Sequence, residues 1–404
     1  MKNRYIKPYS NYIFIPKLKV CSVFCIGLFF SLTGCDSNKD EKPKTPDQLS
    51  YTIPNPTPIS SDSLARYNGV CNYWFDSLLK NSRFNGGMIV AKNGTVVFEK
   101  YQGTGHLNAN DAVNENTPFH IASVSKTFTA MAVLKLWQDK KINIDDEISK
   151  YFPDFNYSSV TIRCLLNHRS GLPNYVYFMN ESGWDTKKCA SNNDVYDYLV
   201  NKKNTLKNIG QPDKYFSYCN TNYVLLALLI EKVTGNSYPE HLKKTIFEPL
   251  QMNNTFVYTT ADSSRTTPSY DWKGTQAAFM DMDKVYGDKN IFSTPRDILK
   301  WDRLLASGQY LNKETLEAAY TPYSHERGGI RNYGLGWRMY AFPDGYKIIY
   351  HNGWWHGNNA SFIRLPKEDA TIIVLGNKYN RSIYKAKYLI GLFSIKNAGN
   401  EEEE

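Results

Sequence analysis

The stretch TPFHIASVSKTFTAMAVLKLW, residues 117–137, carries a serine and a lysine three positions apart. Three residues is slightly less than one helical turn, so Ser123 and Lys126 would lie on the same face where a helix starts. Amide N–H groups at a helix start lack intrahelical partners and form the positive end of the dipole, which suits a nucleophile whose reaction develops an oxyanion. The lysine can accept the serine proton if its surroundings disfavour the ammonium form. The pair also occurs by chance, so an ordinary helix with a surface lysine stays open at this point.

Two later stretches hold polar residues that could complete such a site. Tyr218 and Asn220 stand two positions apart, just before an apolar helical pattern. His351 and Gly353 stand two positions apart at the end of a predicted strand. A tyrosine with a cationic neighbour can share general-base work, and a strand glycine leaves room for a substrate to lie against the strand edge. Taken alone, Tyr218 would more often be a core tyrosine.

The elements that must position these residues follow a simple order along the chain. Residues 62–81 have helical spacing, and residues 88–91 and 95–100 form two strand patterns joined through Lys92-Asn93-Gly94, a strong hairpin signal. A mostly helical pattern follows, and strand patterns return at 334–342, 346–351, 360–366 and 370–377, before an amphipathic helix at 381–393. We therefore predict an α+β fold: an antiparallel sheet built from both chain ends and flanked by helices, with an α-helical region inserted at about 123–330. A cleft between the two parts would hold the site.

The first 35 residues have the pattern of a targeting segment. A basic stretch precedes VCSVFCIGLFFSLTG, an apolar run too short to span a membrane comfortably. It ends in Leu32-Thr33-Gly34-Cys35, which resembles a bacterial lipobox, in which the cysteine is lipidated and becomes the first mature residue. A plain signal peptide or a short anchor helix is the alternative. We expect a signal peptide at 1–34, a flexible tether at 35–61, a globular domain at 62–395 and an acidic disordered tail at 396–404. The protein would be exported and lipid-anchored to a bacterial membrane, on the periplasmic side of the outer membrane or on the cell surface.

The composition indicates a globular protein and gives no support for a nucleic-acid partner. Hydrophobic residues make up 42% of the chain, which has eight tryptophans. Of the net charge of +9, five charges come from the first 20 residues, and no long basic run follows.

Seven cysteines are present. Those of the domain could form disulfides in an exported compartment, although buried free thiols are the simpler interpretation: Cys71, Cys164, Cys189 and Cys219.

The three polar pairs occur in the order of a known motif set. Residues 123–126 (SVSK), 218–220 (YCN) and 351–353 (HNG) match S-x-x-K, Y-x-N, and K-T-G or its H-x-G variant. They resemble the serine β-lactamase and penicillin-binding-protein superfamily, and most closely the class C β-lactamase-like serine hydrolases, which include D-peptidases and esterases. The resemblance extends over residues 62–393 and includes TIRCLLNHRSGLP, GDKNIFSTPRDILKW and YGLGW. It implies a β-lactamase/transpeptidase-like fold, no cofactor, and a small-molecule or peptidoglycan-like peptide or ester substrate.

The resemblance also implies a role for each matched residue. Ser123 would attack a carbonyl carbon to form an acyl-enzyme, and Lys126 and Tyr218 would share the general-base work. The backbone N–H groups of Ser123 and Trp354 would form the oxyanion hole, worth about 3 kcal/mol per donor. Asn220 would hold the substrate amide or orient Lys126.

Two positions depart from the family pattern. Cys219 stands where serine is common, a change we expect to be tolerated. His351 replaces the lysine that suits a substrate carboxylate, and histidine is mostly neutral above about pH 7. The change weakens the β-lactamase interpretation and favours esters and amides. We expect His351 to bind substrate together with Gly353, and to gain charge, and so affinity for anionic substrates, between about pH 8 and pH 6.

Other interpretations remain open from the sequence. A penicillin-recognising sensor that acylates without efficient turnover, or an inactive scaffold, is the alternative to a serine hydrolase acting on an ester, amide or β-lactam. His351 and His356 lack the further ligands of a metal site, so we expect none. We expect His168 to brace a loop. Neither G-x-S-x-G nor a P-loop is present.

The lipobox-like stretch generates the first testable prediction. Expressed in a bacterial host, the protein should fractionate with membranes and incorporate labelled palmitate, because acylation of Cys35 supplies the anchor. Cys35→Ala should lose the label, and Cys189→Ala, which alters a domain cysteine, should keep it. Unchanged labelling in Cys35→Ala would contradict the prediction.

Overall fold

The computed structural model describes residues 49–107, 110–207, 209–326 and 328–396. The predicted signal peptide, Cys35 and the acidic residues 401–404 lie outside the described residues. Residues 49–60, which we assigned to the tether, run along the domain: Tyr51 Oη donates to the Thr245 carbonyl (3.1 Å) and the Thr57 N–H donates to the Asn93 carbonyl (2.9 Å). This part of the predicted tether therefore belongs to the folded unit.

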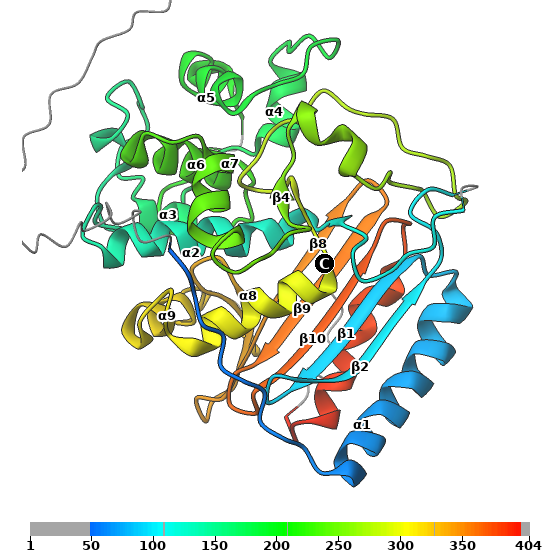
Figure 1. The fold of residues 1–404 in the computed structure, drawn as a ribbon. Helices are drawn as coiled ribbons and strands as arrows, with labels where there is room; N and C mark the ends of the chain where they lie inside the picture. The colour runs from blue at the N-terminus through cyan, green and yellow to red at the C-terminus, as the bar shows by residue number, and fades with distance from the viewer. Residues whose placement is uncertain (1–48, 108–109, 208, 327, 397–404) are drawn as a thin grey trace, which may run out of the picture. The chain divides into compact units, whose positions relative to one another are not determined.

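Within the described residues, seven strands form one antiparallel sheet to which both ends of the domain contribute (Figure 1). Two strands come from the N-terminal part and five from the C-terminal part, so the sheet is built from both chain ends as predicted, with one C-terminal strand, β6 (Arg331–Tyr333), more than the four that were predicted. Asn93 (φ 53°) and Gly94 (φ 76°) adopt the left-handed conformations that a tight hairpin turn requires. In spatial order the strands are β2 (Thr95–Gln102), β1 (Gly86–Lys92), β10 (Ala370–Gly376), β9 (Asn358–Leu365), β8 (Lys347–Trp355), β7 (Arg338–Ala341) and β6 (Arg331–Tyr333).

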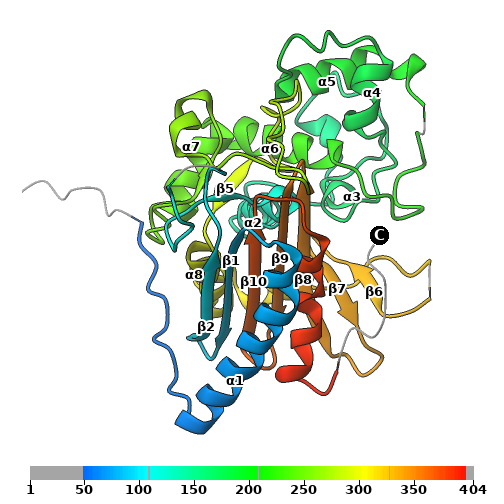
Figure 2. The same cartoon turned by 90° about the vertical axis from the view of Figure 1, so that its right-hand side faces the viewer.

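The inserted region is mainly helical, and its helices α3 to α7 gather beyond one end of the strands (Figures 1 and 2). The α-helices of the described chain are α1 (Ser61–Trp74), α2 (Ser125–Gln138), α3 (Ile162–Leu166), α4 (Tyr175–Glu181), α5 (Asn192–Asn201), α6 (Thr221–Thr234), α7 (Tyr238–Leu242), α8 (Pro295–Ser307) and α9 (Lys313–Ala319). Short π-helical turns are η1 (Phe75–Leu79) and η6 (Lys243–Phe247). The 3₁₀ segments are η2 (Lys80–Ser82), η3 (Ala122–Val124), η4 (Ile148–Lys150), η5 (Lys203–Thr205), η7 (Thr260–Arg265) and η8 (Arg381–Leu392).

Two hydrophobic cores lie on opposite faces of the sheet. Along β1, Ile89 faces the core shared with α2, α6 and α8, while Met88 and Val90 face the core shared with α1 and η8. Successive strand side chains point to opposite faces, so a strand covered on both sides is apolar throughout. Figure 1 shows α8 (yellow) on one face, with α1 (blue) and η8 (red) on the other. The first and last helical segments thus cover one face, as the sequence predicts.

The helix that follows Ser123 lies inside the domain. Nearly every residue of α2 from Ser125 to Leu136 is buried, and α2 packs against α6, which is buried along most of its length. A helix that is apolar almost all round must be surrounded by protein. The start of α2 is therefore held in a fixed position relative to the sheet.

A second, small sheet was not predicted. Its three strands, in the order β3 (Phe119–His120), β5 (Ile291–Ser293) and β4 (Phe256–Val257), are two or three residues long. Strands this short carry no periodic signal. They matter because β3 leads directly into the turn that carries Ser123.

Two other features refine the predictions. Strand β8 continues through His351 to Trp355, beyond the predicted end at 351, while residues 334–337 form a turn with Gly336 at φ 87°. Cys71, Cys164, Cys189 and Cys219 are free thiols, in line with the simpler of the two interpretations.

Within the described ranges, no helix is both long and apolar enough to cross a bilayer.

Candidate active site

Ser123 lies in a tight turn between β3 and α2. The preceding residue, Ala122, has φ 48°, a left-handed conformation that a non-glycine residue rarely adopts. Ser123 belongs to the 3₁₀ segment η3 and is partly exposed, and α2 starts at Ser125. A helix therefore starts where it was predicted, but Ser123 lies in the 3₁₀ turn just before the α-helix and not in its first turn.

Lys126 is fully buried and contacts Ser123 directly. Its Nζ donates to Ser123 Oγ (3.1 Å) and to the carbonyl of Asp288 (2.8 Å). The rings of Tyr218 and Tyr223 have centroids 5.1 and 5.4 Å from the same nitrogen. The lysine is thus held by two hydrogen bonds and two aromatic faces, pointing at the nucleophile.

Tyr218 lies in the segment just before α6, as predicted, and His168 supports this segment. His168 Nδ1 accepts a hydrogen bond from the Cys219 N–H (3.1 Å), and its ring centroid lies 4.2 Å from that of Tyr218. Burial, followed by the Lys126 charge, holds the pKa of His168 well below its usual range. A neutral imidazole can accept the amide hydrogen, so His168 braces the Tyr218 loop.

Asn220 is the N-cap residue of α6, at the end of the Tyr218 loop. Its Oδ1 is buried and has no hydrogen-bond partner among the described residues. A buried acceptor left unpaired is costly, so this oxygen needs a hydrogen-bond donor. The two roles predicted for Asn220, holding a substrate amide or orienting Lys126, stay predictions.

Gly353 lets strand β8 approach the serine turn. A Cβ at this position would lie 2.4 Å from the Ile121 carbonyl oxygen and 3.0 Å from the Ser123 nitrogen. Trp354, the next residue, keeps 63% of its surface exposed. The backbone of β8 at Gly353 and the Ser123 nitrogen therefore lie side by side, and the oxyanion hole formed by Ser123 and Trp354 stays a prediction.

One edge of β8 is open beside the serine. On one side, β8 pairs with β9 as far as Trp355. On the other side, its register with β7 runs from Lys347 to Tyr350, the latter opposite Arg338, and ends before Gly353 and Trp354. Such an edge presents backbone groups to an extended ligand.

His351 faces the protein interior. Its Nδ1 is 2.7 Å from the Asn352 carbonyl oxygen and its Nε2 is 3.2 Å from Tyr333 Oη. The side chain is fully buried, and burial, then the charges of Arg338 and Lys126, hold its pKa well below the usual range. This environment argues against the expectation that His351 gains charge between pH 8 and pH 6, because the cation would be desolvated beside Arg338 and Lys126.

Arg338 brings a permanent positive charge close to Tyr218 and His351. Its guanidinium carbon lies 5.1 Å from the Tyr218 ring centroid, and its charge acts on both His351 and His168. The residue follows the YGLGW stretch directly, so its position along the chain was visible. Its proximity to Tyr218 depends on β7 pairing with β8, which no local pattern shows. The contact of Asp288 with Lys126 was not predicted either, because Asp288 contributes its backbone carbonyl, which any residue type could supply.

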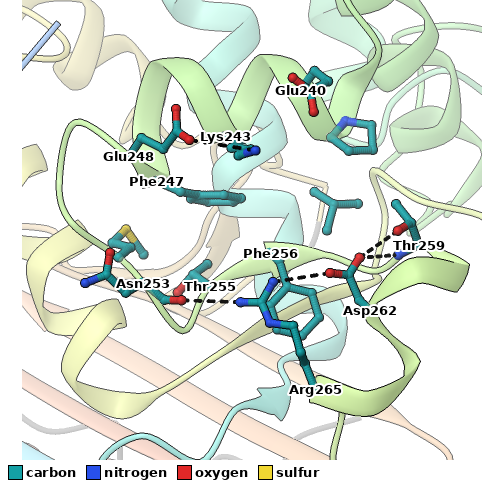
Figure 3. A pocket seen from close by; sticks show the side chains of 13 residues that line it. Glu240, Lys243, Phe247, Glu248, Asn253, Thr255, Phe256, Thr259, Asp262 and Arg265 are labelled. Atoms are coloured by element: carbon teal, nitrogen blue, oxygen red, sulfur yellow. Dashed lines mark hydrogen bonds and ion pairs between the residues drawn. The ribbon is translucent and has the colours of Figure 1, made fainter. Parts of the chain in front are cut away.

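A separate hollow of about 400 Å³ contains none of the motif residues. It lies between α7–η6 and β4–η7 (Figure 3). Arg265 contacts Asp262 (3.2 Å), and Lys243 contacts Glu248 (3.7 Å), across a floor that includes Phe247 and Phe256. Its charged groups already have partners, so the hollow is a poor candidate for catalysis.

Within the described ranges, no three His, Cys, Asp or Glu side chains gather as metal ligands would.

A serine hydrogen-bonded to a buried lysine, beside a tyrosine loop and an open sheet edge, defines the serine β-lactamase and penicillin-binding-protein class. A model of the Beta-lactamase family matches residues 73–391. The chain is 32% identical over 339 residues to Penicillin-binding protein 4* of Bacillus subtilis (strain 168), covering 77% of this chain and 73% of that protein. The chain belongs to the Beta-lactamase family, which supports serine hydrolase activity in general.

Solved structures share the fold. A penicillin-binding protein homologue from Pyrococcus abyssi, described as octameric, superposes with a TM-score of 0.69 at 25% identity, covering 82% of this chain and 78% of that one. The D-amino acid amidase from Ochrobactrum anthropi SV3, solved with L-phenylalanine amide, gives a TM-score of 0.63 at 23% identity, covering 78% and 95%. The β-lactamase/transpeptidase-like α+β fold that the motifs implied is thereby confirmed.

The environment of His351 generates a prediction on pH. The ratio of kcat/KM for an anionic ester to that for a matched neutral ester should stay constant between pH 8 and pH 6. His351 has a pKa well below this range and remains neutral, and protonation of the general base affects both esters alike. The two pH profiles should be measured in parallel at constant ionic strength. A ratio that rises as pH falls, and becomes flat in His351→Asn, would show that His351 does titrate in this range.

Proposed function

We propose that the protein is a serine hydrolase that acts through a covalent acyl-enzyme on an ester or amide carbonyl. The observation that carries the proposal is the 3.1 Å hydrogen bond from the fully buried Lys126 Nζ to Ser123 Oγ. A lysine placed in hydrogen-bond reach of a serine is the arrangement needed to activate that serine as a nucleophile.

The reaction follows from this geometry. Ser123 Oγ attacks the carbonyl carbon, and the hydroxyl proton passes to the base formed by Lys126 and Tyr218. The negative charge that develops on the carbonyl oxygen is bound by the backbone N–H groups of Ser123 and Trp354. The same base returns the proton to the leaving amine or alcohol as the carbon–heteroatom bond breaks. Water then adds to the acyl-enzyme by the same steps and releases the acid.

Two features favour a peptide-like acyl donor over a compact ester. The β7 register ends at Tyr350, before the Gly353–Trp354 stretch of β8 that lies next to Ser123, so an extended backbone could add to β8 there, and the buried Oδ1 of Asn220 would accept a substrate N–H once the site opens to a ligand. Relatives named as a penicillin-binding protein and a D-amino acid amidase point in the same direction. We therefore propose amides and peptides, including those of D-amino acids, as the first substrates to test. With Cys35 acylated, the enzyme would meet them at a bacterial membrane.

The nucleophile can be tested directly. Intact-mass analysis after incubation with a fluorophosphonate should show one adduct, on Ser123. Ser123→Ala should abolish both the adduct and turnover of D-amino acid amides, and Lys126→Ala should lower acylation about 10²–10⁴-fold, because it removes the general base. Ser263→Ala, which alters an exposed serine of η7, is the matched control and should behave like the parent.

The outcomes separate the possible functions. Turnover of an amide or ester that requires Ser123 supports the hydrolase. A burst of one equivalent of product without turnover would show a sensor that acylates and does not deacylate. Labelling that persists undiminished in Ser123→Ala would rule out Ser123 as the nucleophile.

A second prediction concerns the preference of the site for anionic over neutral substrates. Arg338→Gln should lower kcat/KM for an anionic substrate relative to a neutral one by roughly tenfold, equivalent to ~1.4 kcal/mol. The reason is that the Arg338 guanidinium lies 5.1 Å from the Tyr218 ring and its charge also acts on His351. Arg338→Lys should keep most of the preference because it keeps the charge. An equal loss for both substrates would show that Arg338 supports Tyr218 and does not read the substrate's charge.

A further inference from the structure

The two oxyanion donors of the proposed mechanism come from different parts of the chain. The Ser123 N–H belongs to η3, and the Trp354 N–H belongs to β8. A donor stabilises the oxyanion only when it is held at the right distance before the reaction starts. Something must therefore fix η3 relative to the end of β8.

Close to each donor along the chain, a residue other than glycine has a left-handed backbone conformation. Ala122, immediately before Ser123, has φ 48°, and His356, two residues after Trp354, has φ 51°. Residues in this conformation persist only where surrounding contacts hold them. The contacts that hold these two residues lead to the same segment, residues 283–290.

On the serine side, the contact is made by His120. Its Nδ1 accepts a hydrogen bond from the Ala122 N–H (3.2 Å), and its Nε2 lies 3.2 Å from Asn290 Oδ1. Burial lowers the pKa of His120 to about 4, so the ring is neutral, accepts at Nδ1 and donates at Nε2. His120 therefore links the left-handed residue before the nucleophile to Asn290.

On the β8 side, the contact is made by Asp283. Its carboxylate accepts hydrogen bonds from Trp355 Nε1 (2.7 Å) and from His356 Nε2 (2.9 Å). Both donors lie within two residues of Trp354. Asp283 therefore holds the end of β8 and its left-handed residue.

Asn290 joins the two sides. Its Nδ2 donates to the Asp283 carbonyl (2.6 Å), while its Oδ1 faces His120. Asn290 is buried and has φ 75°. A continuous chain of hydrogen bonds thus runs from Ala122 through His120, Asn290 and Asp283 to the end of β8.

We propose that His120, Asn290 and Asp283 form a positioning bridge that sets the spacing between the Ser123 and Trp354 N–H groups. These residues do not touch the substrate and act through the backbone of the two donors. The inference rests on the proposed acyl-enzyme function, because the spacing matters only if an oxyanion forms at this site.

The test uses variants that cut the bridge with little backbone strain. Asn290→Gly removes the linking amide, and glycine tolerates φ 75°. Its kcat/KM for an ester or amide should fall about 10- to 100-fold, less than the ~10²–10³-fold expected for complete loss of one donor. The inhibition constant of phenylboronic acid, whose tetrahedral adduct places an oxygen in the oxyanion hole, should rise by the same factor. The inhibition constant of the carboxylate product, which needs no oxyanion, should stay within about twofold.

Two histidine variants separate the Ala122 contact from general packing. His120→Asn keeps an acceptor near the Ala122 N–H, whereas His120→Leu removes it, so the leucine variant should lose more activity. His241→Asn, which alters a buried histidine of α7, is the matched control and should leave both constants unchanged. Thermal melts of each variant confirm folding. Because His120 and Asn290 act through one bridge, the losses in His120→Leu/Asn290→Gly should be smaller than additive.

Failure of the inference differs from failure of the proposed function. If Ser123→Ala is inactive and Asn290→Gly keeps the parental kcat/KM and boronate inhibition constant, the bridge is refuted and the hydrolase stands. A loss of kcat/KM with no change in boronate inhibition would also refute the bridge. If Ser123→Ala retains turnover, the proposed function itself fails.

Discussion

The buried side-chain amine of Lys126 is the constraint on which the rest of the site depends. A polar group removed from water is costly unless other groups compensate it. Here the compensation comes from Ser123 Oγ, the Asp288 carbonyl, and the rings of Tyr218 and Tyr223. These groups belong to η3, the segment before β5, the loop before α6, and α6 itself. The four must converge for the domain to tolerate the lysine, so the requirements for stability and for catalysis coincide at this residue.

The surroundings of this lysine are organised to keep other ionisable groups neutral. The imidazoles of His168 and His351 are buried near Lys126 and Arg338, and their pKa values lie well below the usual range. Burial also raises the pKa of Tyr333, which contacts His351, so its hydroxyl keeps its proton. The two imidazoles and the phenol therefore add no charge of their own beside Lys126 and Arg338. The guanidinium of Arg338, which is always charged, favours a reaction in which negative charge develops on the substrate.

Several features could be predicted because their signals are local. The hairpin turn at Asn93-Gly94 follows from the conformations that these two residues tolerate, and the strands of the C-terminal part from apolar runs bounded by turns. Ser123 and Lys126 meet because three residues make nearly one helical turn. Tyr218 and Asn220 could be assigned roles only through the motif set, since a single tyrosine before a helix carries no chemical signal.

The contacts that decide how the site works were not visible in the sequence. His351 looked like the residue that reads substrate charge, yet strand pairing turns its ring toward Tyr333 and buries it. The bridge through Asp283 and Asn290 depends on strands β3 and β5, which are too short to have a period.

The sequence by itself determined which residues could react, the order of the motifs, and the division into strands and an inserted helical region, because these follow from side-chain chemistry and neighbours along the chain. Only the tertiary structure decided which ionisable groups are held neutral and which backbone segments lie next to the nucleophile. Burial and distance govern both, and both depend on segments far apart in sequence, such as Ile121 and Gly353, packing within a few ångströms of each other.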